Sequence, residues 1–207
     1  MRTRETLGSF EDVRDAAVRA TGLSDFGGDE HEEGLRILVD DLAGPAGLTP
    51  LGNYLQRAQV RSALVGRLVA QAGFTLNPSY VDVPVERPVF VTGLPRTGTT
   101  ALHRLLTADP RHQGLELWLT EVPQPRPPRD TWPTDPVFTG LQRAYSSHHV
   151  ENPEFMGIHY MDAASVEECW RVLRQAGTSI GFESLAYVPT YSTRQAKQDG
   201  TDSYPRH

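Results

Sequence analysis

The residues best suited to chemistry lie in a short loop between an apolar run and a helical pattern. Residues 89–91 are β-branched or aromatic, as in a buried strand, and Gly93 and Gly98 bracket the loop that follows. Apolar residues then recur at helical spacing over 101–106. Such a turn directs backbone N–H groups and a helix N-terminus toward one point, where a phosphate or sulfate oxyanion binds. The pattern therefore predicts an anion-binding strand-loop-helix unit.

The spacing Gly-x-x-x-x-Gly-x-Thr over residues 93–100 follows the phosphate-binding loop of nucleoside triphosphatases except at one position. Thr99 stands where that loop has its lysine, and the single lysine of the chain, Lys197, lies far downstream. The cationic side chain is instead inside the loop, at Arg96, whose planar guanidinium can clamp two oxygens. A kinase or nucleotide hydrolase with a degenerate loop is one interpretation, and a strand-to-helix turn without a ligand is another.

The loop also carries a family resemblance. The run Pro95-Arg96-Thr97-Gly98-Thr99-Thr100 resembles the 5′-phosphosulfate-binding loop of the sulfotransferases, whose usual form is Pro-Lys-Ser-Gly-Thr-Thr. With the Leu-His-Arg-Leu-Leu that follows, it is most similar to a bacterial branch in which Arg is the normal loop residue. The resemblance implies that these six residues bind the co-substrate 3′-phosphoadenosine-5′-phosphosulfate. Arg96 would neutralise charge on the phosphate leaving group, and no metal is required.

A second segment resembles the same family, whose members often carry His-x-x-Asp-Ala shortly before Glu-Glu-Cys. The matching positions are His159, Asp162, Ala163, Glu167, Glu168 and Cys169. The resemblance implies that His159 takes the proton from an acceptor hydroxyl. The alternative is a histidine that only orders its loop, before a helix that Ser165 and Glu168 would begin as a capping box and that would bury Cys169.

The elements that would position these residues are mostly helical at the start of the chain. Helices are expected from Ser9 to Gly22, over about 29–43, and from Thr49-Pro50 to Gly73. Residues 113–119 form an apolar run of strand length, which predicts a second parallel strand. The six prolines between 123 and 136 predict an ordered loop or a lid, with a proline-rich peptide ligand as the alternative.

The predicted fold class is α/β, with the three-layer fold of the P-loop-containing nucleoside triphosphate hydrolases and a parallel sheet flanked by helices. Residues 1–80 would form a helical segment packed on the core, and residues 81–207 the sulfotransferase core. Sulfotransferases bind the donor's 3′-phosphate through a serine and an arginine on a later strand and helix, and no such segment is evident after Thr92. The core is therefore expected to be truncated, with a partner or a missing C-terminal half completing the site.

Composition limits the partners and the compartment. The 207 residues carry a formal charge of −6, which argues against nucleic acid as a main partner. No run is apolar enough to span a membrane, no signal peptide is evident, and the single Cys169 fits a reducing cytoplasm. Residues 29–33 read as an acidic first helical turn rather than a metal site.

Three functions stay open at this point. They are sulfuryl transfer to a hydroxyl of a carbohydrate, lipid or small aromatic molecule, the kinase or hydrolase, and a non-catalytic anion-binding module.

Overall fold

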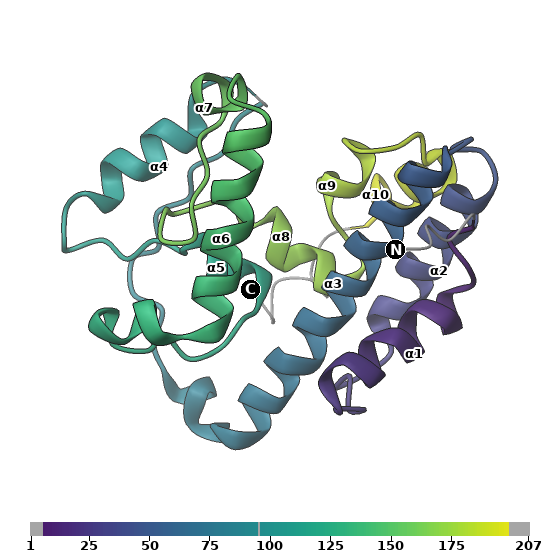
Figure 1. The fold of residues 1–207 in the computed structure, drawn as a ribbon. Coiled ribbons are helices and arrows are strands. Elements are labelled where there is room, and N and C mark those ends of the chain that lie inside the picture. The colour runs from purple at the N-terminus through teal and green to yellow at the C-terminus, as the bar shows by residue number, and fades with distance from the viewer. Residues whose placement is uncertain (1–5, 95, 199–207) are drawn as a thin grey trace. The chain divides into compact units, whose positions relative to one another are not determined.

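Helices make up nearly all the regular structure in the computed structural model, which describes residues 6–94 and 96–198 (Figure 1). The α-helices are α1 (Phe10–Thr21), α2 (Glu30–Ala43), α3 (Pro50–Leu76), α4 (Thr99–Thr107), α5 (Leu117–Glu121), α6 (Pro136–Glu151), α7 (Phe155–Ile158), α8 (Trp170–Leu173), α9 (Ile180–Glu183) and α10 (Pro189–Gln195). The 3₁₀-helices are η1 (Pro78–Asp82), η2 (Arg129–Thr134) and η3 (Arg174–Ala176). Contacts divide the chain into a first unit, up to Leu76 and again from Cys169, and a second unit, Asn77–Glu168.

The predicted α/β fold with a parallel sheet is wrong for the part of the chain that the structure describes. Its one β pairing is an isolated antiparallel bridge between Glu116 and Val166. Residues 89–91 find no neighbouring strand to share ladder hydrogen bonds, and Phe90 is 73% exposed. The apolar run at 113–119 ends in helix α5, because a short apolar run has the same pattern in a buried strand and a buried helix.

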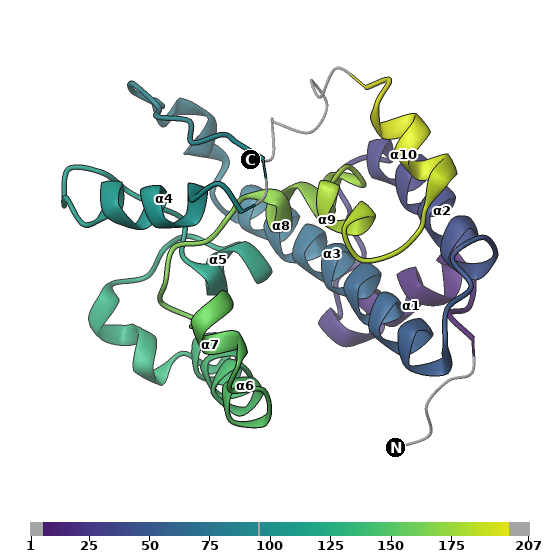
Figure 2. The ribbon, with the colours of Figure 1, turned by 90° about the horizontal axis from the view of Figure 1, so that it is seen from above.

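The first unit is built around α3, with α1 and α2 packed against it and α10 against α2 (Figures 1 and 2). Local signals place these helices as expected. The Ser9 hydroxyl accepts from the Asp12 amide at 3.1 Å, and the Asp12 carboxylate accepts from the Ser9 amide at 3.0 Å. Gly22 ends α1 in the left-handed conformation, with φ 69°. Helix α3 continues through Gly73 to Leu76, since one glycine costs a helix only about 1 kcal/mol.

A buried arginine ties the first unit together. Arg67 of α3 has no exposed surface and donates to the carbonyl oxygens of Phe26, at 2.8 Å, and Gln175, at 3.1 Å. The guanidinium also pairs with the Glu30 carboxylate at 2.5 Å. Arg67 therefore fastens α3 to the loop before α2 and to η3. The apolar core around these helices includes Phe10, Val13, Leu35, Leu38, Leu64 and Leu68.

The second unit packs around aromatic rings. Trp118 of α5 meets Trp132 at a centroid distance of 5.4 Å and Phe138 of α6 at 5.6 Å, both edge-on. Trp132 is 4% exposed, and its indole N–H donates to the Pro127 carbonyl at 3.0 Å. The proline-containing segment is therefore anchored by a buried tryptophan.

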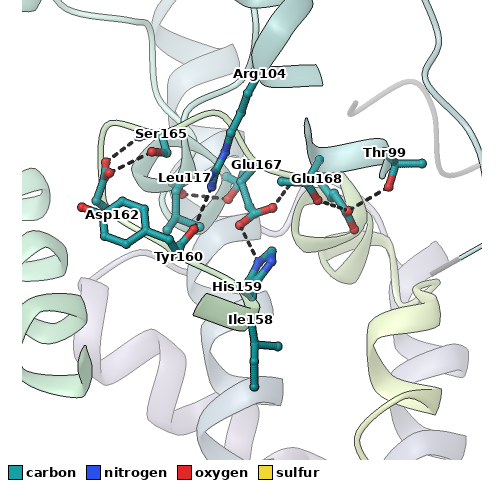
Figure 3. Close-up of polar contacts among 12 residues, drawn as sticks. Thr99, Arg104, Leu117, Ile158, His159, Tyr160, Asp162, Ser165, Glu167 and Glu168 are labelled. Atoms are coloured by element: carbon teal, nitrogen blue, oxygen red, sulfur yellow. Dashed lines mark hydrogen bonds and ion pairs between the residues drawn. The ribbon is translucent and has the colours of Figure 1, made fainter. Parts of the chain in front are cut away.

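A turn at Asp162–Ser165 leads into a stretch that pairs with the residues before α5 (Figure 3). The Asp162 carboxylate accepts from the amides of Ala164, at 2.9 Å, and Ser165, at 2.8 Å, and from the Ser165 hydroxyl at 2.8 Å. Ser165 is therefore held by Asp162. The prediction that Ser165 caps a helix is wrong. The next helix, α8, begins only at Trp170, and Cys169 is exposed rather than buried.

Removing the Arg67 contacts should destabilise the first unit. In Arg67→Met, the carbonyls of Phe26 and Gln175 and the Glu30 carboxylate lose their buried donor, which costs about 3–5 kcal/mol. We expect the Tm measured by circular dichroism to fall by roughly 10 °C or more. The matched control is Arg61→Met, on the exposed side of the same helix, which should change Tm little. Equal Tm values for the two variants would contradict this role.

The turn also perturbs a neighbouring phenol. The Asp162 carboxylate raises the pKa of Tyr160, because the phenolate would lie beside a negative charge, and partial burial raises it further. In Asp162→Asn the charge is lost while one side-chain oxygen still accepts the turn amides, so the Tyr160 pKa should fall. NMR titration of ¹³Cζ-labelled tyrosine measures it, with Tyr160→Phe for assignment. Asp130→Asn is the control, and an unchanged Tyr160 pKa in Asp162→Asn would refute the assignment.

Candidate functional site

The predicted anion-binding loop is a tight turn before α4. Arg96 and Gly98 both adopt positive φ angles, 68° and 92°. Gly93 is required by space, since a Cβ there would lie 2.9 Å from the Thr97 hydroxyl oxygen and 3.0 Å from the Thr99 methyl. The Thr97 hydroxyl donates to the Leu94 carbonyl at 2.6 Å and closes the turn. The predicted loop residue Pro95 lies outside the described residues.

The first turn of α4 presents its amides without a side-chain cap, because Gly98 is the N-cap. A carboxylate reaches this helix end. The Thr100 hydroxyl donates to Glu168 Oε1 at 2.9 Å, and the Thr99 hydroxyl donates to the same oxygen at 3.4 Å (Figure 3). A negative group near a helix N-terminus is favoured by the helix dipole. Glu168 therefore engages two hydroxyls of the predicted anion-binding loop.

The predicted base, His159, is held by the neighbouring glutamate. His159 Nε2 lies 3.2 Å from Glu167 Oε2, and the two side chains are 32% and 3% exposed (Figure 3). Glu167 is itself fixed, because its other carboxylate oxygen accepts from the Glu168 amide at 3.1 Å and its own amide donates to the Leu115 carbonyl at 2.9 Å. A fixed carboxylate beside Nε2 orients the imidazole ring. Nδ1 is then the ring nitrogen that does not face Glu167.

Arginine contacts connect the loop and α4 to the segment around His159. The Arg96 guanidinium donates to the carbonyl of Ile158 at 3.2 Å, and the Arg104 guanidinium donates to the carbonyl of Tyr160 at 2.8 Å. These two carbonyls flank His159 in the chain. The structure thus brings together the predicted cation and the predicted histidine, which are far apart in the sequence.

Sequence reasoning missed the roles of three site residues. Glu167 was noted only as a matching position, Glu168 was predicted to be part of a capping box with Ser165, and Arg104 was not singled out. The adjacency of Glu167 and Glu168 could have indicated these roles. Neighbouring side chains on an extended stretch point to opposite sides and can contact two different segments. Nothing in the sequence shows which carboxylate becomes buried.

The described residues contain no group of three or more metal-ligating side chains. In the suspected acidic stretch, the buried His31 ring stacks on Phe26 at a centroid distance of 5.5 Å, as part of the packing. None of the described helices is long and apolar enough to cross a membrane.

Comparison with known proteins assigns this arrangement to a family. The profile described as "Sulfotransferase family" matches residues 88–201, which include the loop, α4 and the His159–Glu168 segment. A search of curated proteins gives no significant match.

Solved structures of two mycobacterial sulfotransferases resemble the chain closely. Sulfotransferase STF1 from Mycobacterium tuberculosis H37Rv is 48% identical, with a TM-score of 0.91 over 99% of this chain and 56% of that chain. Sulfotransferase STF9 from Mycobacterium avium is 29% identical, with a TM-score of 0.84 over 96% of this chain and 51% of that chain. The chain therefore spans about half the length of these structures. With its loop, its histidine segment and these matches, the chain belongs to the sulfotransferase family.

Proposed function

We propose that this chain carries the donor loop and the base of an enzyme that transfers a sulfuryl group from 3′-phosphoadenosine-5′-phosphosulfate to an acceptor hydroxyl. The observation that supports this most is the Arg96 contact with the Ile158 carbonyl, which keeps the loop cation beside the histidine segment. Sulfuryl transfer needs positive charge at the leaving phosphate and a base at the acceptor, and these two groups supply them.

The donor would lie at residues 93–100. The uncapped amides at the start of α4 and the hydroxyls of Thr99 and Thr100 would hold the phosphosulfate, and Arg96 would stabilise charge growing on the phosphate oxygen. Each donor of this type commonly lowers the barrier by a few kcal/mol. The hydroxyls now donate to Glu168, so they must turn away from this carboxylate to donate to the donor's oxygens.

The base would be His159. As the acceptor oxygen forms its bond to sulfur, the bond from sulfur to the bridging phosphate oxygen breaks, and adenosine-3′,5′-bisphosphate leaves. The acceptor proton passes to the imidazole nitrogen that does not face Glu167. Glu167 is a positioning residue here, because its carboxylate fixes the ring and stabilises the imidazolium that forms.

Two alternatives differ in what they require. A kinase or nucleotide hydrolase would need a lysine at Thr99 to reach the β- and γ-phosphates, so the loop disfavours it. A non-catalytic anion-binding module would bind the donor without transfer. The acceptor class, a carbohydrate, lipid or small aromatic alcohol, is part of the proposal, as are a partner that supplies the 3′-phosphate contacts and the cytoplasmic setting suggested by the lone cysteine.

Donor binding should depend on the loop charge. We expect Arg96→Ala to weaken binding of adenosine-3′,5′-bisphosphate about tenfold or more, since a charge-assisted hydrogen bond is worth roughly 1.5–3 kcal/mol. Glu168→Gln should strengthen binding, because it removes a negative charge that engages the loop hydroxyls. Calorimetric titration measures both, with the exposed Arg143→Ala as control. Binding that is indifferent to Arg96, or equal affinity for ATP, would count against the proposal.

The role of Glu167 can be read from the imidazole itself. In the native chain we expect His159 to carry its proton on Nε2, facing the carboxylate, and ¹⁵N NMR of the ring reports this tautomer. Glu167→Gln removes the charge at nearly constant shape, so the tautomer preference should weaken and the rate of sulfuryl transfer should fall at least tenfold.

The matched control is Glu168→Gln, one residue away, which should leave the His159 spectrum unchanged. A native-like tautomer in Glu167→Gln would exclude the positioning role. A changed tautomer without any transfer by the native chain would instead preserve the contact and reject the enzymatic proposal.

A further inference from the structure

A polar cavity lies in the second unit, apart from the donor loop. Its volume is about 450 Å³, and it is bordered by the second half of α4, the stretch before α5, two arginines of the proline-containing segment and the turn at 164–166. No described residue of the loop 93–98 borders it. Residues Arg104 and Thr107 lie five and eight positions after Thr99, about 7–12 Å along the helix axis. The cavity is therefore a separate candidate binding site.

Positive charge predominates on the cavity wall. The lining residues include three arginines and one carboxylate, which are Arg104, Arg126, Arg129 and Glu116. Arg126 is satisfied, because its guanidinium lies 2.9 Å from Glu116 Oε2 and donates to the Gly114 carbonyl at 2.5 Å. The wall is left with two guanidinium charges that no carboxylate neutralises.

The other two arginines retain donors for a ligand. Arg104 donates one hydrogen bond, to the Tyr160 carbonyl, and makes no ion pair with a carboxylate among the described residues. The Arg129 guanidinium lies 5.3 Å from the centroid of the Trp132 ring and has no hydrogen bond or ion pair within the described ranges.

The wall also holds an acceptor. Glu116 borders the cavity and is 8% exposed, and one oxygen of its carboxylate, Oε2, is ion-paired with Arg126. A hydroxyl of a ligand could donate to it. The volume exceeds that of an oxyanion alone and falls in the range of small-molecule sites, so an organic body fits with the anionic group.

We propose that this cavity binds a phosphate monoester whose organic body carries hydroxyl groups, as in a sugar phosphate. Two uncompensated guanidinium charges match the two negative charges of such a phosphate, and planar guanidinium groups bind phosphate oxygens in pairs. A sulfate monoester, with a single negative charge, should bind more weakly. The Glu116 carboxylate would accept from a hydroxyl of the body. This site is additional to the donor loop and does not depend on sulfuryl transfer.

Calorimetric titration of the full chain with glucose 6-phosphate tests the site. We expect saturable binding that is about tenfold or more weaker in Arg129→Ala, unchanged in Arg143→Ala, and largely kept in Arg129→Lys, which retains the charge. Neutral glucose should not bind, and glucose 6-sulfate should bind less tightly. Circular dichroism in the aromatic region verifies that each variant keeps the packing of Trp132.

Arg96→Ala separates this site from the donor loop, because it should leave glucose 6-phosphate binding intact. Binding lost in Arg96→Ala but unchanged in Arg129→Ala would place the phosphate at the donor loop and overturn the second site while leaving the proposed function standing. No saturable binding, or equal binding of glucose, would overturn it as well. Failure of the native chain to bind adenosine-3′,5′-bisphosphate, with glucose 6-phosphate binding retained, would do the reverse and reject only the donor loop.

Discussion

Two adjacent carboxylates hold the candidate site together. Glu167 and Glu168 follow an extended stretch, so their side chains leave the backbone in different directions, one to His159 and the other to the hydroxyls at the start of α4. The stretch is itself fastened by backbone hydrogen bonds from the Glu167 amide to Leu115 and from the Leu117 amide to Ser165. Any shift of this stretch by one residue would exchange the two carboxylates. The placement of His159 and of the loop therefore depends on a single backbone register.

Two arginine contacts hold the backbone on either side of His159. Arg96 and Arg104 donate to the carbonyls on either side of His159, so the backbone around the histidine is held from the loop and from α4. Hydrogen bonds from charged groups to carbonyls are generally stronger than neutral ones. Arg96 thus holds the histidine segment, and under the proposed function it would also attract the anion. The two roles are compatible because a guanidinium has five N–H donors, so others remain for the ligand.

Several features set by residues close in sequence were predicted correctly, whereas features that depend on contacts between distant residues were not. Helix ends set by near neighbours, such as the cap at Ser9 and the glycine at 22, were predicted correctly, and the structure adds Asp12 as the partner of Ser9. The anion loop was also placed before a helix, as its glycines required. The parallel sheet was wrong, because strands depend on partners distant in sequence. The Ser165 cap was wrong because the Ser165 amide, which would donate to Glu168 in a capping box, donates to Asp162 instead. Burial of Glu167 follows from tertiary packing that no local pattern encodes.

The helical surroundings of the loop lead to one further consequence for specificity. Oxyanion binding at a loop and helix N-terminus uses backbone amides and short hydroxyls, which recognise charge and size but little else. Discrimination among anionic ligands must then come from side chains that contact the rest of the ligand. In the second unit, Arg96 lies in this turn, whereas Arg104, Arg129 and Glu116 border the separate cavity. Under the two proposals, the first turn of α4 would serve the sulfuryl donor and its second half, with Arg129 and Glu116, would serve a second ligand, so selectivity at each site would depend on different side chains.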